Sequence, residues 1–164
     1  MGLERLACIM QDVDSIFDID TIRKILDSVA QMAGVEYQAG NEQNDVSLRI
    51  ITDHLRSMVF MIADGIMPSN EGRGYVLRRT IRRAIRHGRM LGITKPFLDG
   101  AVDAVIEIFG DVKDFSELVS KEEYIKRVIR IEEERFAATL VQGIDLLNEE
   151  IDSLKANAQQ ILPG

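Results

Sequence analysis

Apolar residues recur at steps of three and four along most of this chain, and this spacing constrains the fold more than any other feature. Between residues 47 and 66 the pattern consists of Leu48, Ile51, Leu55, Met58, Val59 and Ile62. Such spacing places apolar side chains on one face of an α-helix, which Gly65 and Pro68 end. Only 5% of the residues are aromatic, whereas Leu, Ile, Ala, Arg and Glu abound, and this composition also favours helices. We therefore expect an all-α fold.

Further helices are expected from the same pattern. Glycine or a turn ends each of the segments 22–33, 74–91 and 96–109, and the polar residues 38–44 form an expected loop. From Ser116 the helical spacing continues almost to Leu154, at Val119, Tyr124, Val128, Ile131, Phe136, Leu140, Ile144, Leu147 and Ile151. Because the loops are short, consecutive helices are expected to be antiparallel. The prediction is an antiparallel helical bundle with a long C-terminal helix.

Charge is distributed unevenly. The chain has a net charge of −7, yet residues 72–98 contain eight basic and no acidic residues. On a helical wheel of ~100° per residue, Arg78, Arg79, Arg82, Arg83, Arg86 and Arg89 share an arc of about 140°, and Val76, Leu77, Ile81, Ala84 and Ile85 form the expected core side. Like charges at this spacing repel, so either neighbouring acidic residues neutralise the arginines or a polyanion binds them. Since all six are Arg, which binds phosphate through two hydrogen bonds and stacks on bases, nucleic acid is favoured.

Several classes of protein and site are disfavoured. Cys8 is the only cysteine and no Cys/His cluster has zinc-ligand spacing, so we expect a reducing compartment and no structural metal. No apolar run is long enough for a membrane span, and the expected location is cytoplasmic. His54 and His87 are expected to make structural hydrogen bonds. The run Glu132-Glu133-Glu134 is expected to be a solvated helix face.

Three stretches of the sequence are distinctive: residues 49–56 (RIITDHLR), residues 62–79 (IADGIMPSNEGRGYVLRR) and the opening MGLER. The first two closely resemble the tRNA-recognition region of alanyl-tRNA synthetases, and the third resembles motif 3 of class II synthetases. The resemblance covers nearly the whole chain. It implies that residues 1–40 are a motif 3 remnant with the following helices of the catalytic domain, and that residues 41–164 are the helical domain that recognises the tRNA acceptor stem.

The resemblance also implies roles for individual residues. In the family, an Asn after a Pro-Ser dipeptide contacts a G·U wobble pair in the acceptor stem of alanine tRNA, and Asn70 matches it. Asn can donate and accept in the exposed minor groove of A-form RNA. The alternative for Asn70 is a helix cap or a turn residue next to Ser69. Arg5 matches the motif 3 arginine that contacts ATP, which with Mg²⁺ is a ligand of the parent enzyme. Contacts to RNA are expected from Asn70, Arg73, Arg78, Arg79, Arg82, Arg83, Arg86 and Arg89.

Other parts of such an enzyme are expected outside this chain. The first two class II motifs lie upstream in the family, the editing and oligomerisation regions lie downstream, and an acidic wobble-pair residue should follow a segment like 161–164. We therefore expect ATP-dependent attachment of alanine to tRNA from the parent enzyme, and neither activity nor a cofactor from this chain alone. An alternative is a helical protein-interaction module whose basic face binds an acidic partner.

Overall fold

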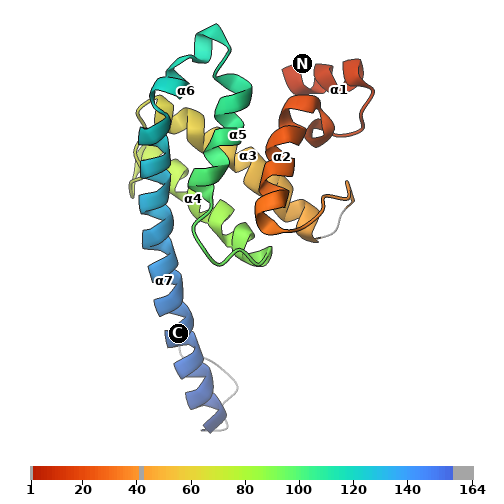
Figure 1. The fold of residues 1–164 in the computed structure, drawn as a ribbon. Helices are drawn as coiled ribbons and strands as arrows, with labels where there is room; N and C mark the ends of the chain where they lie inside the picture. The colour runs from red at the N-terminus through yellow and green to blue at the C-terminus, as the bar shows by residue number, and fades with distance from the viewer. Residues whose placement is uncertain (1, 41–42, 157–164) are drawn as a thin grey trace. The chain divides into compact units, whose positions relative to one another are not determined.

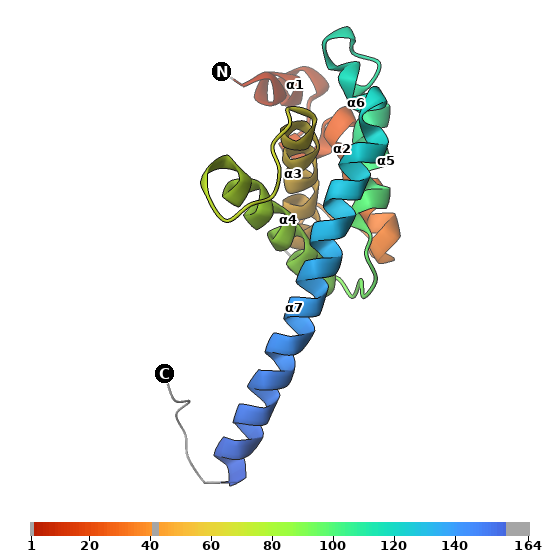
Figure 2. The ribbon, with the colours of Figure 1, turned by 90° about the vertical axis from the view of Figure 1, so that its left-hand side faces the viewer.

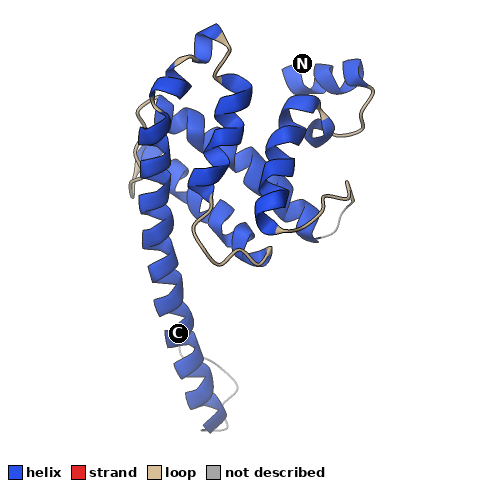
Figure 3. Ribbon diagram, in the orientation of Figure 1, coloured by secondary structure: helices blue, strands red, loops and turns tan. Residues whose placement is uncertain are grey.

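The structure is a computed structural model that describes residues 2–40 and 43–156, and all regular secondary structure among these residues is helical (Figures 1 and 3). The elements are α1 (Leu3–Gln11), η1 (Ile16–Asp18), α2 (Asp20–Ala33), α3 (Gln43–Ala63), α4 (Gly72–Met90), α5 (Leu98–Phe109), η2 (Lys113–Phe115), α6 (Glu117–Ser120) and α7 (Glu122–Ala156). The predicted all-α bundle with a long C-terminal helix is confirmed.

The helix α3 is the centre of the first compact unit, which comprises residues 1–133. It packs against α2, α4, α5 and α6 (Figure 2). The apolar positions that the sequence pattern places on one face of α3 are fully buried, from Leu48 to Ile62. Phe60 adds an aromatic cluster, since its ring lies 5.5 Å from Phe109 and 5.1 Å from Phe115, both edge to face. The core thus joins α3 to α5 and to the segment before α6.

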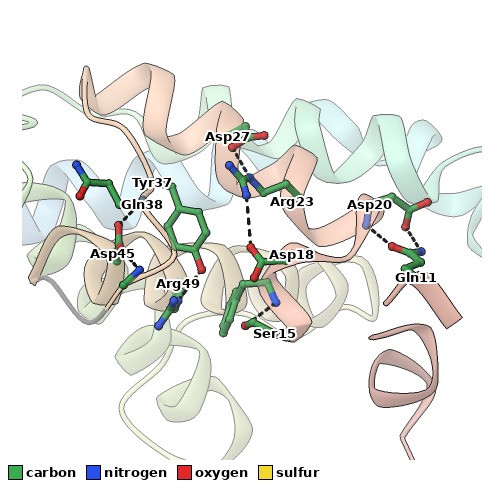
Figure 4. A network of polar contacts seen from close by, with 12 residues as sticks. Gln11, Ser15, Asp18, Asp20, Arg23, Asp27, Tyr37, Gln38, Asp45 and Arg49 are labelled. Atoms are coloured by element: carbon green, nitrogen blue, oxygen red, sulfur yellow. Dashed lines mark hydrogen bonds and ion pairs between the residues drawn. The ribbon is translucent and has the colours of Figure 1, made fainter. Parts of the chain in front are cut away.

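The expected loop 38–44 is wrong at its C-terminal end, because α3 begins at Gln43. Asp45, in the first turn of α3, is 1% exposed. Its carboxylate accepts hydrogen bonds from the backbone N–H groups of Gln38 and Gly40, at 3.0 and 2.7 Å (Figure 4). A buried acidic residue in the first turn of α3 therefore holds the segment that precedes the helix. Residues 41 and 42, which the expected loop includes, lie outside the described residues.

The segment between α2 and α3 is also held by Tyr37 (Figure 4). Its hydroxyl accepts a hydrogen bond of 2.9 Å from Nε of Arg49. The guanidinium groups of Arg23 and Arg49 lie 4.9 and 5.2 Å from the centre of its ring. Arg23 also pairs with Asp18 and Asp27, at 3.4 and 2.8 Å. These contacts connect η1, α2 and α3 through arginine side chains that the sequence pattern does not single out.

In the first turns of α7, the expected core positions are confirmed only at Val128. Ile125, Val128 and Ile129 are buried, whereas Tyr124 and Ile131 are exposed. Val119 is likewise exposed, because Leu118 is the residue of α6 that enters the core. The spacing correctly predicts a helix here, but steps of three and four allow two neighbouring faces. The second unit comprises residues 134–164, and its described part continues α7 to Ala156, with Val141, Ile144 and Leu147 exposed.

The helix boundaries differ elsewhere by a few residues. The helix expected over 74–91 begins at Gly72 and ends at Met90, and the one expected from Pro96 begins at Leu98. The expected division of the chain into two domains, residues 1–40 and residues 41–164, stays a prediction. Among the described residues, no helix is long and apolar enough to span a membrane, and no group of three or more His, Cys, Asp or Glu side chains could hold a metal ion.

Candidate nucleic-acid interface

The turn between α3 and α4 folds back closely onto the start of α4. The backbone N–H of Ser69 donates to the carbonyl of Gly74 at 3.1 Å, and the Ser69 hydroxyl donates to the carbonyl of Glu71 at 2.9 Å. A Cβ atom on Gly74 would lie 2.2 Å from Ser69 Oγ and 2.3 Å from the carbonyl oxygen of Met67. Only glycine at position 74 therefore allows this approach. The turn presents Asn70 as an exposed residue two positions before the start of α4.

The side chain of Asn70 is oriented by Arg78, one of the predicted RNA-binding residues. Nη1 of Arg78 donates to Oδ1 of Asn70, and Nη2 donates to the carbonyl of Pro68 at 3.3 Å. Since a guanidinium group can only donate, the amide oxygen of Asn70 must face Arg78, and the amide nitrogen is directed elsewhere. Arg78 thus holds both the backbone and the side chain of the turn.

Two of the six arginines are paired with a buried carboxylate of α7. Oε1 of Glu132 lies 2.8 Å from Nε of Arg82, in a hydrogen bond, and 3.3 Å from Nε of Arg78, without hydrogen-bond alignment. Glu132 is only 3% exposed. The expectation that residues 132–134 form a solvated face is wrong for Glu132 and for Glu133, which is 2% exposed, and holds for Glu134 alone. The buried carboxylate of Glu132 therefore offsets part of the positive charge of α4.

Glu133 joins α7 to the start of α5. Its carboxylate accepts hydrogen bonds from the backbone N–H groups of Phe97 and Leu98, at 3.1 and 3.2 Å. These donors belong to the first turn of α5, which has no capping side chain of its own. Burial raises the pKa of the Glu133 carboxyl to about 7; the two backbone donors oppose this shift, Asp99 adds to it, and Arg89 opposes it. Arg89 is therefore electrostatically coupled to a buried carboxylate.

The remaining arginines of the predicted site are exposed. Arg73, Arg79, Arg83, Arg86 and Arg89 all reach solvent, and none forms an ion pair with a described residue. On the wheel of ~100° per residue, Arg79, Arg83 and Arg86 lie within about 60° of one another, whereas Arg78, Arg82 and Arg89 lie on the side nearer α7. We call Arg79, Arg83 and Arg86 the arginine stripe. Exposed Tyr75 and Val76 lie beside the stripe, so the expected core position of Val76 is wrong.

The two histidines are placed as structural residues, as expected. Nδ1 of His87 lies 3.1 Å from the hydroxyl oxygen of buried Ser47, which links α4 to α3. Burial lowers the pKa of His87, and the positive charges of Arg83 and Arg86 lower it further, followed by His54. His54 pairs with its neighbour Asp53 at 3.4 Å. Arg5 is an exposed residue of α1, while its neighbour Glu4 pairs with Arg56.

Three residues of the later segment contact the end of α3, the turn or α4, and sequence reasoning missed these contacts. Nζ of Lys121 donates to the carbonyl of Ala63, at 2.8 Å, and the Tyr124 hydroxyl lies 2.9 Å from Sδ of Met67. Glu132 is the third. The only available signal was the absence of acidic residues in 72–98, which requires any neutralising carboxylate to come from another helix.

Comparison with known proteins identifies the family of this chain. The family described as tRNA synthetases class II (A) matches residues 1–164. This chain belongs to that family. The matching relatives include an alanine–tRNA ligase of Alkaliphilus oremlandii, 56% identical over 164 residues, and one of Alkaliphilus metalliredigens, 54% identical over the same length. An alanine–tRNA ligase of Clostridioides difficile is 52% identical. The resemblance to alanyl-tRNA synthetases is therefore confirmed.

The share of each relative that is matched is small. All of this chain is aligned in each of the three cases, but it spans only 18% of the length of those ligases. The expectation that the chain corresponds to a part of a synthetase is consistent with this share. The segment 161–164, after which an acidic wobble-pair residue is expected, lies outside the described residues.

Proposed function

We propose that this chain is the part of an alanine–tRNA ligase that binds the acceptor stem of alanine tRNA. The observation that carries the proposal is the arginine stripe, which is exposed, lacks ion pairs with described residues and follows the turn that presents Asn70. Three neighbouring positive charges on one helix face repel one another, and a phosphate backbone would remove that repulsion.

The predicted site residues have different roles in this proposal. Arg79, Arg83 and Arg86, with Arg73 and Arg89 at either end of α4, contact phosphates and set the position of the stem without reading its sequence. Asn70 supplies base discrimination at the wobble pair through the minor groove. Arg78 and Arg82 also contribute positive charge, which their pairing with Glu132 partly offsets, and Arg78 in addition supports the turn.

The chemistry of the parent enzyme is proposed to be ATP-dependent attachment of alanine to tRNA, in the cytoplasm and as a step of protein biosynthesis. Arg5 can donate to ATP phosphates when the rest of the catalytic domain surrounds it. In the parent enzyme, Mg²⁺ would be held by one or two carboxylates together with the ATP phosphates. The chain alone is therefore proposed to be inactive, and its partners are the alanine tRNA acceptor stem and the catalytic and editing domains of the same polypeptide.

The second candidate function is a protein-interaction module in which the arginine stripe binds an acidic partner. Both functions use the same charges, so binding to an anion alone does not separate them. A base-paired stem offers phosphates at regular spacing on a rigid helix, whereas a peptide is flexible and must be ordered on binding.

A direct titration tests the proposal. The chain is titrated with a hairpin that reproduces the acceptor stem of alanine tRNA and, in parallel, with an acidic peptide of equal total charge. We expect tighter binding to the hairpin, and weaker binding when the wobble pair is replaced by a Watson–Crick pair. Equal or tighter binding of the peptide would contradict the RNA-binding function and support the interaction module.

A further inference from the structure

The segment from Lys121 to Glu132 supports the α3–α4 turn at three points. Lys121 donates to the carbonyl of Ala63 at the end of α3, Tyr124 contacts Met67 within the turn, and Glu132 pairs with Arg78. Arg78 in turn donates to Asn70 and to Pro68. The side chain proposed to recognise a base pair is therefore connected, through one arginine, to a carboxylate that is 62 positions away in the sequence.

We propose that Glu132 is a positioning residue that fixes the orientation of the Asn70 amide through Arg78. The inference rests on the proposed function, because it concerns how Asn70 meets the acceptor stem. Glu132 itself is 3% exposed and cannot contact RNA directly. Its effect on recognition must pass through the arginines with which it pairs.

The geometry explains why a buried carboxylate is needed. Nε of Arg78 and Nε of Arg82 share the single oxygen Oε1 of Glu132, at 3.3 and 2.8 Å. The ion pair keeps the Nε side of the Arg78 guanidinium toward Glu132 without a hydrogen bond, and Nη1 at the far end donates to Oδ1 of Asn70. Arg78 and Arg82 are one turn apart and would repel each other without the shared carboxylate. Without the negative charge of Glu132, the Arg78 side chain would be free to move away from the α3–α4 turn. The amide oxygen of Asn70 would then lose its hydrogen-bond donor.

The first experiment measures the environment and mobility of the Asn70 side-chain amide in the absence of RNA. The side-chain amide signals of Asn70 are assigned in an NMR spectrum of the whole chain by their loss in Asn70→Asp. We expect Glu132→Gln to shift or broaden these signals toward those of a mobile Asn. Arg78→Lys should do the same, because lysine keeps the charge but lacks the planar fork. Glu134→Gln is the matched control, since Glu134 is the exposed neighbour, and should leave the signals unchanged.

The second experiment measures recognition. Affinities are compared for acceptor-stem hairpins that carry the wobble pair or a Watson–Crick pair at the same position. We expect Glu132→Gln to reduce the preference for the wobble stem by about five-fold, the lower end for a base contact, while the dependence of affinity on salt is unchanged. In an Asn70→Ala background, Glu132→Gln should have no further effect on the preference, because both changes remove the same contact.

The outcomes separate this inference from the proposed function. Unchanged Asn70 signals in a folded Glu132→Gln variant would overturn the positioning role, whatever the RNA results. Altered signals with an unchanged stem preference would also overturn it as a determinant of recognition. If the unmodified chain binds neither hairpin, the proposed function fails, and the NMR comparison still decides whether Glu132 holds Asn70. Should Glu132→Gln fail to fold, as judged by circular dichroism, Glu132→Asp replaces it, because the shorter side chain keeps the charge but moves the carboxylate away from Arg78; unchanged Asn70 signals in that variant would overturn the positioning role.

Discussion

Arginine residues are used differently in two regions of this molecule. Near the N-terminus, Arg23 pairs with Asp18 and Asp27, and Arg49 donates to Tyr37 while its guanidinium lies 5.8 Å from the centre of the Phe17 ring. On α4, Arg79, Arg83 and Arg86 have no ion pair with a described residue and reach solvent. The first group ties helices together. The guanidinium groups of the second group remain exposed to solvent, where a bound ligand such as an RNA phosphate can reach them.

A third group of arginines combines features of the first two. Arg78 and Arg82 belong to the basic helix but share the buried carboxylate of Glu132. The difference teaches that the position of an arginine on a helical wheel does not determine its use. The use depends on which acidic and aromatic side chains the other helices bring to it, and this can be tested residue by residue.

The largest effect on the free energy of unfolding is expected from removing the carboxylate that pairs with Arg78 and Arg82. Glu132→Ala leaves Arg78 and Arg82 without their shared carboxylate, and we expect a loss of about 2 to 4 kcal/mol, somewhat below the usual range for breaking a buried ion pair because both arginines partly reach solvent. Urea denaturation followed by circular dichroism measures the change. A loss below about 0.5 kcal/mol, typical of surface substitutions, would mean that the pair does not support the fold.

The second effect concerns the pH dependence of stability. The pKa of Glu133 is raised to about 7 in the folded chain from an ordinary value of 4.5. Because the folded state then binds the proton more tightly than the unfolded state, the free energy of unfolding should fall as pH rises between 4.5 and 7. At about 1.4 kcal/mol per pKa unit, the fall is about 1 to 3 kcal/mol. It should be absent in Glu133→Gln; an equal slope in that variant would assign it to other groups.

A third prediction compares one arginine from each group. Arg49→Ala removes a hydrogen bond and two cation–π contacts, and should destabilise the chain by about 1 to 2 kcal/mol. Arg79→Ala should change stability by no more than about 0.5 kcal/mol, since it relieves repulsion and alanine favours the helix. Thermal unfolding of the two variants side by side gives both values. Similar losses in both would remove the distinction between the two groups.

A smaller effect should appear at His87, which reports the electric field of the stripe. The charges of Arg83 and Arg86 help to lower its pKa. RNA phosphates bound at these arginines would offset that field, so the pKa of His87 should rise on addition of the acceptor-stem hairpin, by less than about one unit at a partly screened site. An NMR titration of the imidazole with and without RNA measures it. An unchanged or lowered pKa would place the RNA elsewhere.

The sequence predicts the helices well because their apolar spacing is regular, as in α3, where every predicted core position from Leu48 to Ile62 is buried. It fails where the same spacing allows two faces, as at Ile125 and Ile131 of α7. The turn containing Asn70 could be identified from its residues. The partners of Arg78 and Arg82 could not, because Glu132 is distant in the sequence and an acidic run is usually solvated.

The claim that the arginine stripe binds phosphates is tested most directly by the salt dependence of hairpin binding. The Arg79→Gln, Arg83→Gln double variant is compared with a control of equal net charge, Lys24→Gln, Arg127→Gln, whose residues are exposed on α2 and α7. Each lost phosphate contact should reduce the slope of log affinity against log salt by about 0.7 to 1, so the stripe variant should lose about 1.4 to 2, and the control almost nothing. Slopes equal to that of the unmodified chain in both variants would show that the stripe does not contact RNA.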